Sequence, residues 1–354
     1  MRAFVPILTL TLLLTGCAED KHTNPVVSPH SAIRVGVAFD IGGRGDKSFS
    51  DSAAKGIDRA RQELGVEVNE VEASVGEAQG QKEARLRDLA NAGYNPIIAV
   101  GFAYAASLAR VAPAYPKVDF AIIDDDSVKA DNVANLVFSE EQGSFLVGVI
   151  AAKASKTHVI GFIGGVHEPI IGKFEAGFAA GARTIDTHVV VKRTYLTEPP
   201  DFSGFTDPAA AERAARALYA AGADVVFHAA GGSGLGLFRA AVASGKWAIG
   251  VDADQYLQLP EGERDMILTS MIKRIDIAVF DFIKSAVNGD PTAGTKRYDL
   301  SAGGIDYSAS NPQVAPYVPE TEMYRQKLLT GKIVVPLTPV VRKSTTLHPD
   351  LGEG

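Results

Sequence analysis

From residue 33 onward, short apolar runs alternate with stretches of helical spacing, and this alternation constrains the fold more than any other feature. In the first half, strands are expected at 33–39, 66–71, 96–100 and 118–123, and helices at 50–64, 77–92 and 103–111. Strands separated by helices of about 10 to 15 residues are typical of βαβ units and a parallel sheet. The chain is therefore predicted to be an α/β protein.

The second half repeats this rhythm. Strands are expected at 159–163, 189–191, 224–228 and 247–251, and helices at 141–155, 168–182, 208–221 and 235–244. A chain of 354 residues is long for a single core, so two lobes of roughly 130 to 180 residues are expected. The halves look similar in architecture, although they share no convincing residue-level repeat. The expected arrangement is two α/β lobes that face each other over a cleft.

Ligands of open α/β sheets bind beyond the carboxyl ends of the strands. The polar residues at or just after these predicted strand ends are Asp40, Asp124 and Asp252, with glycines at Gly101, Gly164, Gly231, Gly232 and Gly234. A site that needs polar groups converging on one small molecule is expected there.

A glycine-rich loop joins the first predicted strand to the first long helix, from Asp40 to Phe49. Its glycines permit tight turns and close approach of a ligand. The structural alternative is a strand–helix loop in which Asp46 or Ser48 caps the helix and Phe49 belongs to the core. The sequence leaves both interpretations open.

A second glycine-rich loop, 231–236, follows a strand and opens a helix, with Asp252 downstream. This context resembles a dinucleotide-binding fingerprint and is the strongest argument for an enzyme. The spacing is G-x-G-x-G rather than G-x-G-x-x-G. Backbone amides that open toward a small polar ligand are the preferred interpretation.

Other catalytic, metal and nucleic-acid signals are weak. The sequence has no G-x-S-x-G elbow and no H-E-x-x-H pattern, and His167 and His228 are expected to be structural. The acidic run that begins at Asp124 could hold a metal, but a loop with one capping acid is preferred. The net charge is −7 and no basic cluster carries interleaved aromatics, so no nucleic-acid partner is expected. We expect no catalytic residue, no metal and no cofactor.

The N-terminus reads as a processing signal. A positive start is followed by an apolar run at 4–14 and by Leu14-Thr15-Gly16-Cys17, which resembles a bacterial lipobox. Cys17 is the single cysteine of the chain and is expected to carry the lipid. The alternative is an ordinary signal peptide with an incidental cysteine. Residues 18–31 are polar and are expected to form a tether, and no later run reaches 18 apolar residues. The folded part is therefore expected to lie outside the cytoplasm, anchored to a membrane.

Short motifs in a fixed order resemble the basic membrane protein family of solute-binding lipoproteins. The matching motifs are Asp40-x-Gly-Gly, Asp46-Lys-Ser-Phe49, Phe138-Ser-Glu-Glu-Gln-Gly-Ser-Phe-Leu-Val-Gly148, Gly161-Phe-Ile-Gly-Gly165, Phe174-Glu-Ala-Gly-Phe178, Phe205-Thr-Asp-Pro208, Ala230-Gly-Gly-Ser-Gly234, Gly250-Val-Asp-Ala-Asp-Gln255 and Thr269-Ser-Met-Ile-Lys-Arg274. The resemblance runs from Ile33 to Pro336. The best-understood members of that family bind purine nucleosides for ABC transporters.

The resemblance implies a type I periplasmic-binding-protein fold, with two Rossmann-like lobes joined by three crossing segments. The expected division is a signal peptide at 1–16, a lipidated tether at 17–32, an N-terminal lobe at 33–137 plus 255–292, and a C-terminal lobe at 138–254 plus 293–345.

The resemblance also implies roles for individual residues. Phe49 and Phe205 would sandwich the base, one from each lobe, and Asp40 would accept hydrogen bonds from the base edge. Asp252 and Lys273 would hold the ribose hydroxyls, and Gly231 would contact the ligand through its backbone. Asp124 would lie near the base or the hinge. Phe202 is a second candidate for stacking, and Ser50 stands where many relatives have asparagine.

The resulting hypothesis is a lipid-anchored receptor that captures a nucleoside, with purine nucleosides preferred, and delivers it to the permease of an ABC importer. A second hypothesis keeps the fold but binds a sugar or another heterocycle, or acts as a sensory lipoprotein. A third is an exported enzyme that acts on a nucleoside or sugar. Fold alone does not separate them.

Overall fold

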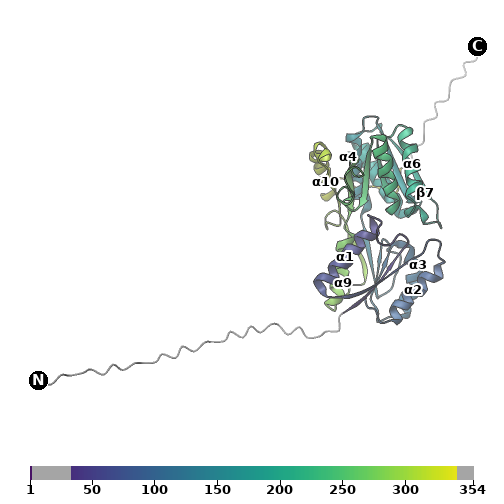
Figure 1. Ribbon diagram of the computed structural model, residues 1–354, viewed down its shortest axis with the longest axis vertical. Helices are drawn as coiled ribbons and strands as arrows, with labels where there is room; N and C mark the ends of the chain where they lie inside the picture. The colour runs from purple at the N-terminus through teal and green to yellow at the C-terminus, as the bar shows by residue number, and fades with distance from the viewer. Residues whose placement is uncertain (2–32, 341–354) are drawn as a thin grey trace, which may run out of the picture. The chain divides into compact units, whose positions relative to one another are not determined.

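The computed structural model describes Met1 and residues 33–340. Cys17 and the predicted tether at 17–32 lie outside the described residues, as does nearly all of the predicted signal peptide. Within the described part of the chain, no helix is long and apolar enough to cross a membrane. Residues 33–340 form two six-stranded sheets, each flanked by helices (Figure 1).

The first sheet has the strand order β11-β5-β4-β3-β1-β2, and every neighbouring pair is parallel. Its strands are β1 (Arg34–Phe39), β2 (Glu67–Glu72), β3 (Ile97–Val100), β4 (Phe120–Ile123), β5 (Val133–Phe138) and β11 (Gly294–Tyr298). The apolar alternation did not predict β5. This strand carries Asn135 in its middle, whose buried amide donates to the carbonyl of Val128 at 2.9 Å.

Four α-helices accompany this sheet: α1 (Phe49–Leu64), α2 (Gln79–Asn91), α3 (Ala105–Val111) and α9 (Ile275–Val287), with short 3₁₀ turns at Phe102–Tyr104 and Ala112–Ala114. α1 ends at Gly65, which adopts a left-handed conformation (φ 66°) that glycine tolerates best. α1 packs closely against α9, because Gly56 leaves room for the backbone of Asp276. A Cβ atom on Gly56 would lie 2.4 Å from that carbonyl oxygen.

The second sheet has the order β12-β10-β9-β8-β6-β7, with β12 antiparallel to β10 and the other pairs parallel. Its strands are β6 (Val159–Val166), β7 (Val190–Thr197), β8 (Val225–Ala229), β9 (Trp247–Asp252), β10 (Ile267–Lys273) and β12 (Ile305–Tyr307). β7 is longer than the run expected at 189–191.

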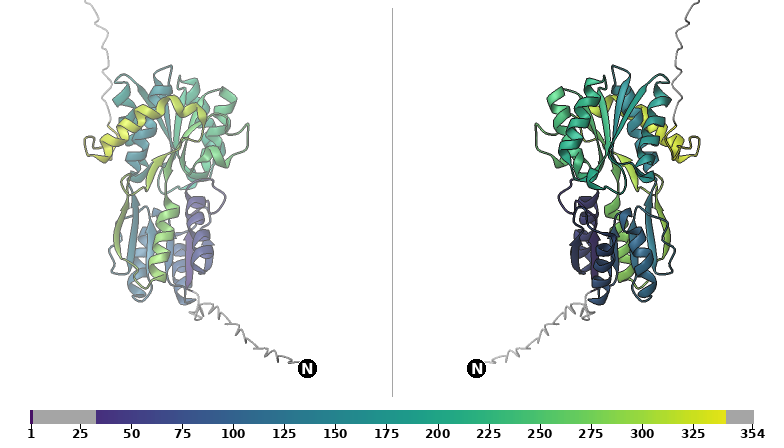
Figure 2. Two further views of the ribbon diagram at one scale, coloured as in Figure 1. Left: turned by 90° about the vertical axis from the view of Figure 1, so that its left-hand side faces the viewer. Right: turned by 90° about the vertical axis from the view of Figure 1, so that its right-hand side faces the viewer.

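The helices of this second lobe are α4 (Glu140–Ala154), α5 (Pro169–Ile185), α6 (Pro208–Ala220), α7 (Gly234–Ser244), α8 (Gln255–Gln258) and α10 (Val318–Leu329), with 3₁₀ turns at Ser203–Phe205, Gly231–Ser233 and Pro312–Tyr317. Asp207 caps α6 by accepting from the backbone N–H of Ala210 at 2.8 Å. Figure 2 shows α10, the yellow helix, lying across the outer side of this lobe.

The two sheets repeat one strand order, with β1 to β5 of the first corresponding to β6 to β10 of the second. The chain passes between sheets three times: after β5, after β10 and after β11. This is the two-lobed α/β architecture that was predicted.

The lobe boundaries differ from the expected ones. β10 (Ile267–Lys273) lies in the second sheet, whereas residues 255–292 were assigned to the first lobe. β11 (Gly294–Tyr298) lies in the first sheet, although residues 293–345 were assigned to the second. The apolar pattern predicted neither of these strands, and β11, whose sequence is Gly-Thr-Lys-Arg-Tyr, is mostly polar. Pairing with β9 (Met271 opposite Val251) and with β5 (Tyr298 opposite Phe138) determines where each strand belongs.

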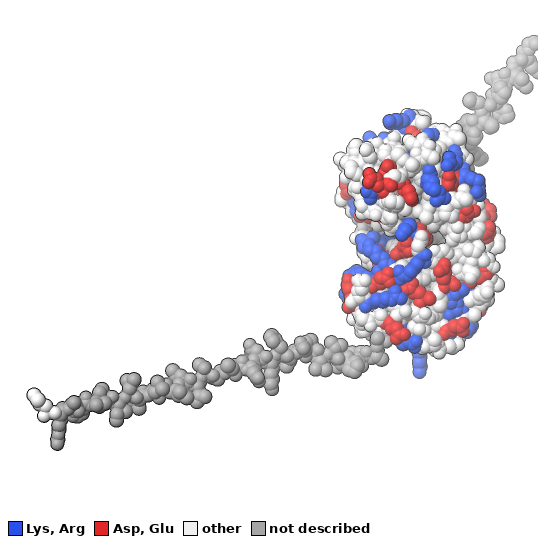
Figure 3. All heavy atoms as spheres, in the orientation of Figure 1, with Lys and Arg blue, Asp and Glu red and all other residues white. Residues whose placement is uncertain are grey.

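Charges of both signs are interspersed over the face of the molecule drawn in Figure 3. The guanidinium group of Arg44 illustrates this pattern, because it pairs with Asp58 at 2.8 Å and with Glu70 at 2.7 Å.

Candidate ligand-binding site between the two lobes

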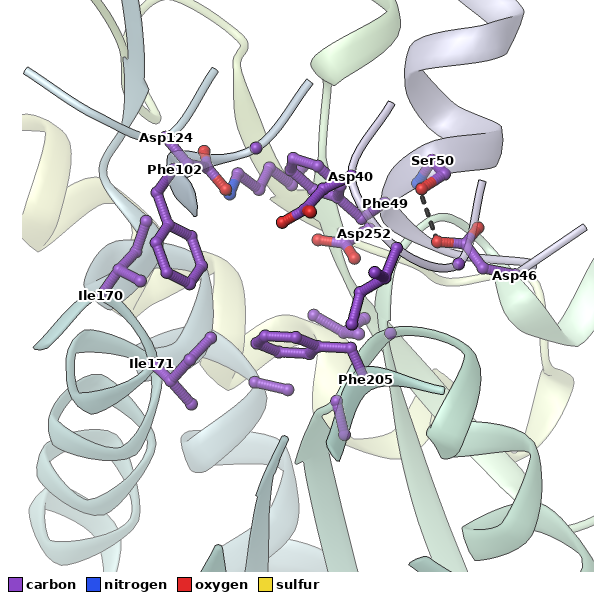
Figure 4. A pocket seen from close by; sticks show the side chains of 18 of the residues that line it. Asp40, Asp46, Phe49, Ser50, Phe102, Asp124, Ile170, Ile171, Phe205 and Asp252 are labelled. Carbon is purple, nitrogen blue, oxygen red and sulfur yellow. Dashed lines mark hydrogen bonds and ion pairs between the residues drawn. The ribbon is translucent and has the colours of Figure 1, made fainter. Parts of the chain in front are cut away.

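A cavity of about 730 Å³, which includes the open space at its mouth, lies between the carboxyl ends of the two sheets. Side chains from both lobes point into it (Figure 4). All seven residues proposed from the sequence line it: Asp40, Phe49, Asp124, Phe205, Gly231, Asp252 and Lys273. The structure therefore brings these residues together, and their contacts with a ligand remain predictions.

The first-lobe loop both anchors the start of α1 and places a side chain on the cavity wall. The carboxylate of Asp46 accepts from the backbone N–H groups of Ser48, Ser50 and Asp51 at 2.8 to 3.0 Å, which anchors the start of α1. Burial raises the pKa of Asp46 even though these three hydrogen bonds oppose the shift. With the loop fixed in this way, Phe49 projects into the cavity as the first residue of α1.

Asp124 and Asp252 occupy equivalent places in the two lobes. Asp124 directly follows β4, and Asp252 ends β9, the strand that corresponds to β4 in the second sheet. Both adopt the left-handed backbone conformation that is uncommon for residues other than glycine, with φ of 70° and 65°. Backbone conformations of this kind concentrate at functional sites.

Lys273 is the buried cation of the site, with only 1% of its side chain exposed. Its Nζ lies 2.6 Å from Oδ2 of Asp124 and 3.2 Å from Oε1 of Glu140. Burial lowers the pKa of Lys273, but Asp124 and Glu140 outweigh burial, so the pKa lies above its ordinary value. Burial raises the pKa of Asp124 to about 6, although Lys273 opposes the shift.

Asp252 has a neutral partner in place of a cation at hydrogen-bonding distance. The hydroxyl of Ser48 donates to Oδ2 of Asp252 at 2.5 Å, across the gap between the lobes. Burial raises the pKa of Asp252 to about 7, with the charge of Lys273 opposing the rise. The bonds from Ser48 to Asp252 and from Lys273 to Asp124 each link one lobe to the other.

Two oxygens of these acids are buried without a hydrogen bond to any residue that the structure describes. They are Oδ1 of Asp124 and Oδ1 of Asp252. Buried polar atoms are nearly always paired, so an unpaired acceptor beside a cavity indicates a place for a donor. Hydroxyl or N–H groups of a ligand have the required chemistry.

The apolar part of the cavity comes from both lobes. Phe49 lies on the first-lobe side and Phe205 on the second-lobe side, with Phe102, Ile170 and Ile171 beside Phe205 (Figure 4). The Phe205 ring contacts that of Phe102 edge-on, with centroids 6.4 Å apart.

The alternative stacking candidate, Phe202, has another position. It contacts Phe102 edge-on at 5.8 Å and is not among the residues that line the cavity. The structure therefore places Phe205, rather than Phe202, on the cavity wall. Ser50 also lines the cavity, at the start of α1.

The second glycine-rich loop contributes Gly231 to the cavity wall near Phe205. Gly231 has φ of 52°, and a Cβ atom there would lie 3.3 Å from the carbonyl oxygen of Phe205. Gly234 packs on the ring of His228, where a Cβ atom would lie 1.9 Å away. His228 is fully buried and its Nε2 lies 3.1 Å from Oε1 of Gln255. Burial lowers the pKa of His228 to about 4, so it is neutral at pH 7 and has a structural position.

The acidic loop after β4 uses its second member as a cap. The carboxylate of Asp125 accepts from the backbone N–H and the hydroxyl of Ser127 at 2.8 and 2.6 Å. Among the described residues, no group of three or more His, Cys, Asp or Glu side chains is placed to hold a metal ion.

Several cavity or partner residues were not chosen from the sequence as site residues. Ser48 was considered only as a helix cap, and Glu140 was part of a family motif without an assigned role. The aliphatic and aromatic lining residues Phe102, Ile170 and Ile171 were not singled out, and Phe174 was part of a family motif without an assigned role. Phe102 follows Gly101 at a strand end, which is the signal that could have identified it.

Fold and site together define a two-lobed binding protein whose ligand cavity lies at the carboxyl ends of both sheets. A family model described as "ABC transporter substrate-binding protein PnrA-like" (Bmp) matches residues 33–338. The chain belongs to this family of ABC transporter substrate-binding proteins.

Two relatives and a solved structure are similar to the chain over most of its length. The chain is 30% identical to the ABC transporter nucleoside-binding protein BmpA of Lactococcus lactis, covering 93% of this chain and 96% of that protein. It is 34% identical to a CD4+ T-cell-stimulating antigen of Listeria monocytogenes, over 92% of this chain and 94% of that protein. A solved ABC-transporter solute-binding protein from Aeropyrum pernix superimposes with a TM-score of 0.74 at 30% identity, covering 86% of this chain and 94% of that one.

Proposed function

We propose that this protein captures a nucleoside, with purine nucleosides preferred, between its two lobes and delivers it to the permease of an ABC importer. The family supports the transport role, and the name of the Lactococcus lactis relative supports the ligand class. The observation that carries the proposal is the pair of phenylalanines, Phe49 and Phe205, on opposite walls of one cavity.

A nucleobase has two apolar faces, and each face needs its own platform. Phe49 belongs to the first lobe and Phe205 to the second, so closing the lobes on a base creates both stacking contacts in one event. Each such contact contributes roughly 1 to 3 kcal/mol. Closure would also present a new surface formed by the two lobes to the permease.

The polar end of the cavity suits a ribose. Its hydroxyls could donate to the unpaired Oδ1 atoms of Asp252 and Asp124, and Lys273 offers an ammonium donor nearby. The proposed contact of Gly231 is through its backbone, since this residue lines the cavity without a side chain. Asp40 lies on the first-lobe wall, where it would accept from the base edge.

The lining residues favour binding over bond breaking. No histidine or cysteine is among the described residues that line the cavity, and its single lining serine, Ser50, shows no side-chain bond to a base. An activated nucleophile needs such a neighbour. We therefore propose a receptor rather than an enzyme.

We further propose that Cys17 carries a lipid that anchors the protein to a bacterial membrane, with the folded part facing the periplasm or the exterior. A relative from Pyrococcus furiosus, 33% identical over 86% of this chain, is named a lipoprotein. Replacing Cys17 with alanine should shift the protein from the membrane fraction to the soluble fraction of the cell envelope. An unchanged distribution would contradict the anchor.

The binding proposal is tested by titration calorimetry of the chain from Asn24 onward, after ligand carried through purification is removed by unfolding and refolding. The ligands are adenosine, guanosine, inosine, cytidine and ribose. One-to-one binding of purine nucleosides, tighter than that of cytidine and without product formation, is the expected result. Binding of ribose alone would favour a sugar receptor. Silence toward all five would leave the fold unchanged and refute the nucleoside proposal.

A further inference from the structure

The carboxylate of Asp40 lies on the cavity wall, but its ionic partner stands behind that wall. Lys82, on α2, places its Nζ against Oδ1 of Asp40. The side chains of Lys82 and Asp40 are 8% and 18% exposed, and Lys82 is not among the residues that line the cavity. The other oxygen of Asp40, Oδ2, receives no hydrogen bond from the described residues.

Lys82 is itself held in place by a chain of buried groups. Its Nζ lies 4.8 Å from the centre of the Tyr104 ring, and Tyr104 is fully buried. The hydroxyl of Tyr104 donates to the carbonyl of Phe39 at 3.1 Å and accepts from Arg85 at 2.9 Å. Arg85 in turn pairs with Glu77 at 2.6 Å. This packing fixes the ammonium group and, through it, the orientation of the Asp40 carboxylate.

We propose that Lys82 is a positioning residue, which occupies Oδ1 of Asp40 and leaves Oδ2 to accept a hydrogen bond from the ligand. The site therefore selects nucleosides whose base edge presents an N–H donor. The inference rests on the proposed function and names the feature of the ligand that this cavity reads. Adenine offers its amino group, and hypoxanthine and guanine offer the N1–H group. The unsubstituted purine base has ring nitrogens that only accept, so it would face Oδ2 with lone pairs.

The role of the lysine follows from what a carboxyl group does without it. A buried carboxyl group that lacks a cation favours its protonated form, and that form donates a hydrogen bond as well as accepting one. It could then serve a ring nitrogen as readily as an amino group. With Lys82 on Oδ1, Oδ2 remains an acceptor, and a base without a donor leaves that oxygen desolvated and unpaired.

The test compares adenosine with purine riboside, which has the same ribose and ring system and lacks only the amino group. Calorimetry on the full folded chain gives the ratio of the two dissociation constants. In the wild-type protein, purine riboside should bind roughly 10- to 100-fold more weakly than adenosine. In Lys82→Met the ratio should fall below about threefold. Lys82→Gln, which keeps a donor for Oδ1, should give an intermediate ratio and serves as a second variant if Lys82→Met does not fold.

Two controls separate positioning from a structural effect. Lys156→Met removes an exposed lysine of the second lobe and should keep the wild-type ratio. In an Asp40→Asn background, adding Lys82→Met should change the ratio no further, because Lys82 acts through Asp40.

The outcomes distinguish the two proposals. Equal weakening of both ligands in the folded Lys82→Met variant, with the ratio retained, would overturn the positioning role alone. A wild-type protein that binds adenosine and purine riboside with equal affinity would also overturn the positioning role. A wild-type protein that binds neither these nucleosides nor inosine would overturn the proposed function and this inference with it.

Discussion

Asp124 and Asp252 hold equivalent positions in the two lobes but have partners of different charge. Each lies at the carboxyl end of the corresponding strand, each adopts a left-handed backbone, and each reaches a side chain of the opposite lobe. Asp124 meets the ammonium of Lys273 at 2.6 Å, whereas Asp252 meets the hydroxyl of Ser48 at 2.5 Å. The pKa follows this difference, since burial raises it to about 6 in Asp124 and to about 7 in Asp252.

The comparison teaches that a repeated fold does not produce a repeated site. The same backbone turn delivers a carboxylate from each lobe, and the partner decides how readily that carboxylate carries charge. The first lobe's acid is part of a buried ion pair, and the second lobe's acid is held by a neutral donor. The following predictions test this asymmetry.

The largest expected effect is the loss of the buried cation. Lys273→Met leaves Asp124 and Glu140 buried without the ammonium that lies 2.6 and 3.2 Å from them. We expect the free energy of unfolding to fall by roughly 3 to 5 kcal/mol. Chemical denaturation at pH 7 measures it. Lys296→Met, at an exposed lysine 3.5 Å from Asp281, is the matched control and should change stability by less than about 1 kcal/mol. Equal effects of the two variants would contradict a central role for Lys273.

The aromatic walls should behave symmetrically where the acids do not. Phe49→Ala and Phe205→Ala each remove one stacking platform, so each should weaken nucleoside binding by about 1 to 3 kcal/mol. Phe202→Ala is the control, because Phe202 contacts Phe102 at 5.8 Å but does not line the cavity. Titration calorimetry measures the nucleoside affinity of all three variants. Wild-type affinity in Phe49→Ala and Phe205→Ala would refute the stacking assignment.

The sequence predicted the architecture and the strand-end residues for a physical reason. Parallel strands separated by helices leave their carboxyl ends at one edge, so Asp40, Asp124 and Asp252 could be found from local pattern alone. The hydrogen-bonding partners of these acids could not be found in this way. Ser48 and Asp252 are 204 positions apart, and Lys273 and Asp124 are 149 apart, so their pairing depends on how the lobes pack.

The same limit explains the two lobe boundaries that differ. The apolar pattern predicted neither strand, and only tertiary contacts assigned β10 to the second sheet and the mostly polar β11 to the first. The resemblance to a known family, rather than local pattern, selected Phe205 and Lys273, and it gave ligand-binding roles to Phe49 and Gly231, which the glycine-rich loops had already drawn attention to.

The pH dependence of stability should separate the two acids. Both bind a proton in the folded state at pH values where the unfolded chain, with an aspartate pKa near 4, has lost it. The contribution of each is therefore fully present at acid pH, declines as the pH rises above about 4, and stops declining once the pH passes the folded pKa. The decline should end near pH 6 for Asp124 and near pH 7 for Asp252.

Replacing Asp252 with asparagine should remove its part of this decline. Between about pH 5 and 8, the unfolding free energy of the ligand-free wild type should fall by about 1 kcal/mol or more relative to Asp252→Asn. For Asp124→Asn, the corresponding change in unfolding free energy relative to the wild type should occur at lower pH. Denaturation curves across this range measure both. Parallel profiles for the wild type and Asp252→Asn would contradict the raised pKa of Asp252.

The smallest effect is expected from the hydroxyl that holds Asp252. Ser48 is fully buried and donates to Oδ2, so Ser48→Ala leaves both oxygens of Asp252 without a donor among the described residues. We expect a loss of about 1 kcal/mol in unfolding free energy at pH 8, where Asp252 is ionised. At pH 5 the loss should be smaller, because the protonated acid tolerates burial better.

Ser52→Ala provides the control for this prediction. Ser52 is a buried serine four residues further along, and its hydroxyl lies 3.5 Å from the carbonyl oxygen of Lys273, at the limit of a hydrogen bond. Replacing Ser52 should lower the unfolding free energy only slightly at both pH 5 and pH 8. If Ser48→Ala and Ser52→Ala lose the same stability with the same pH dependence, then the neutral donor does not set the charge of Asp252. The asymmetry between the two acids would then have to arise from burial and from their unequal distances to Lys273.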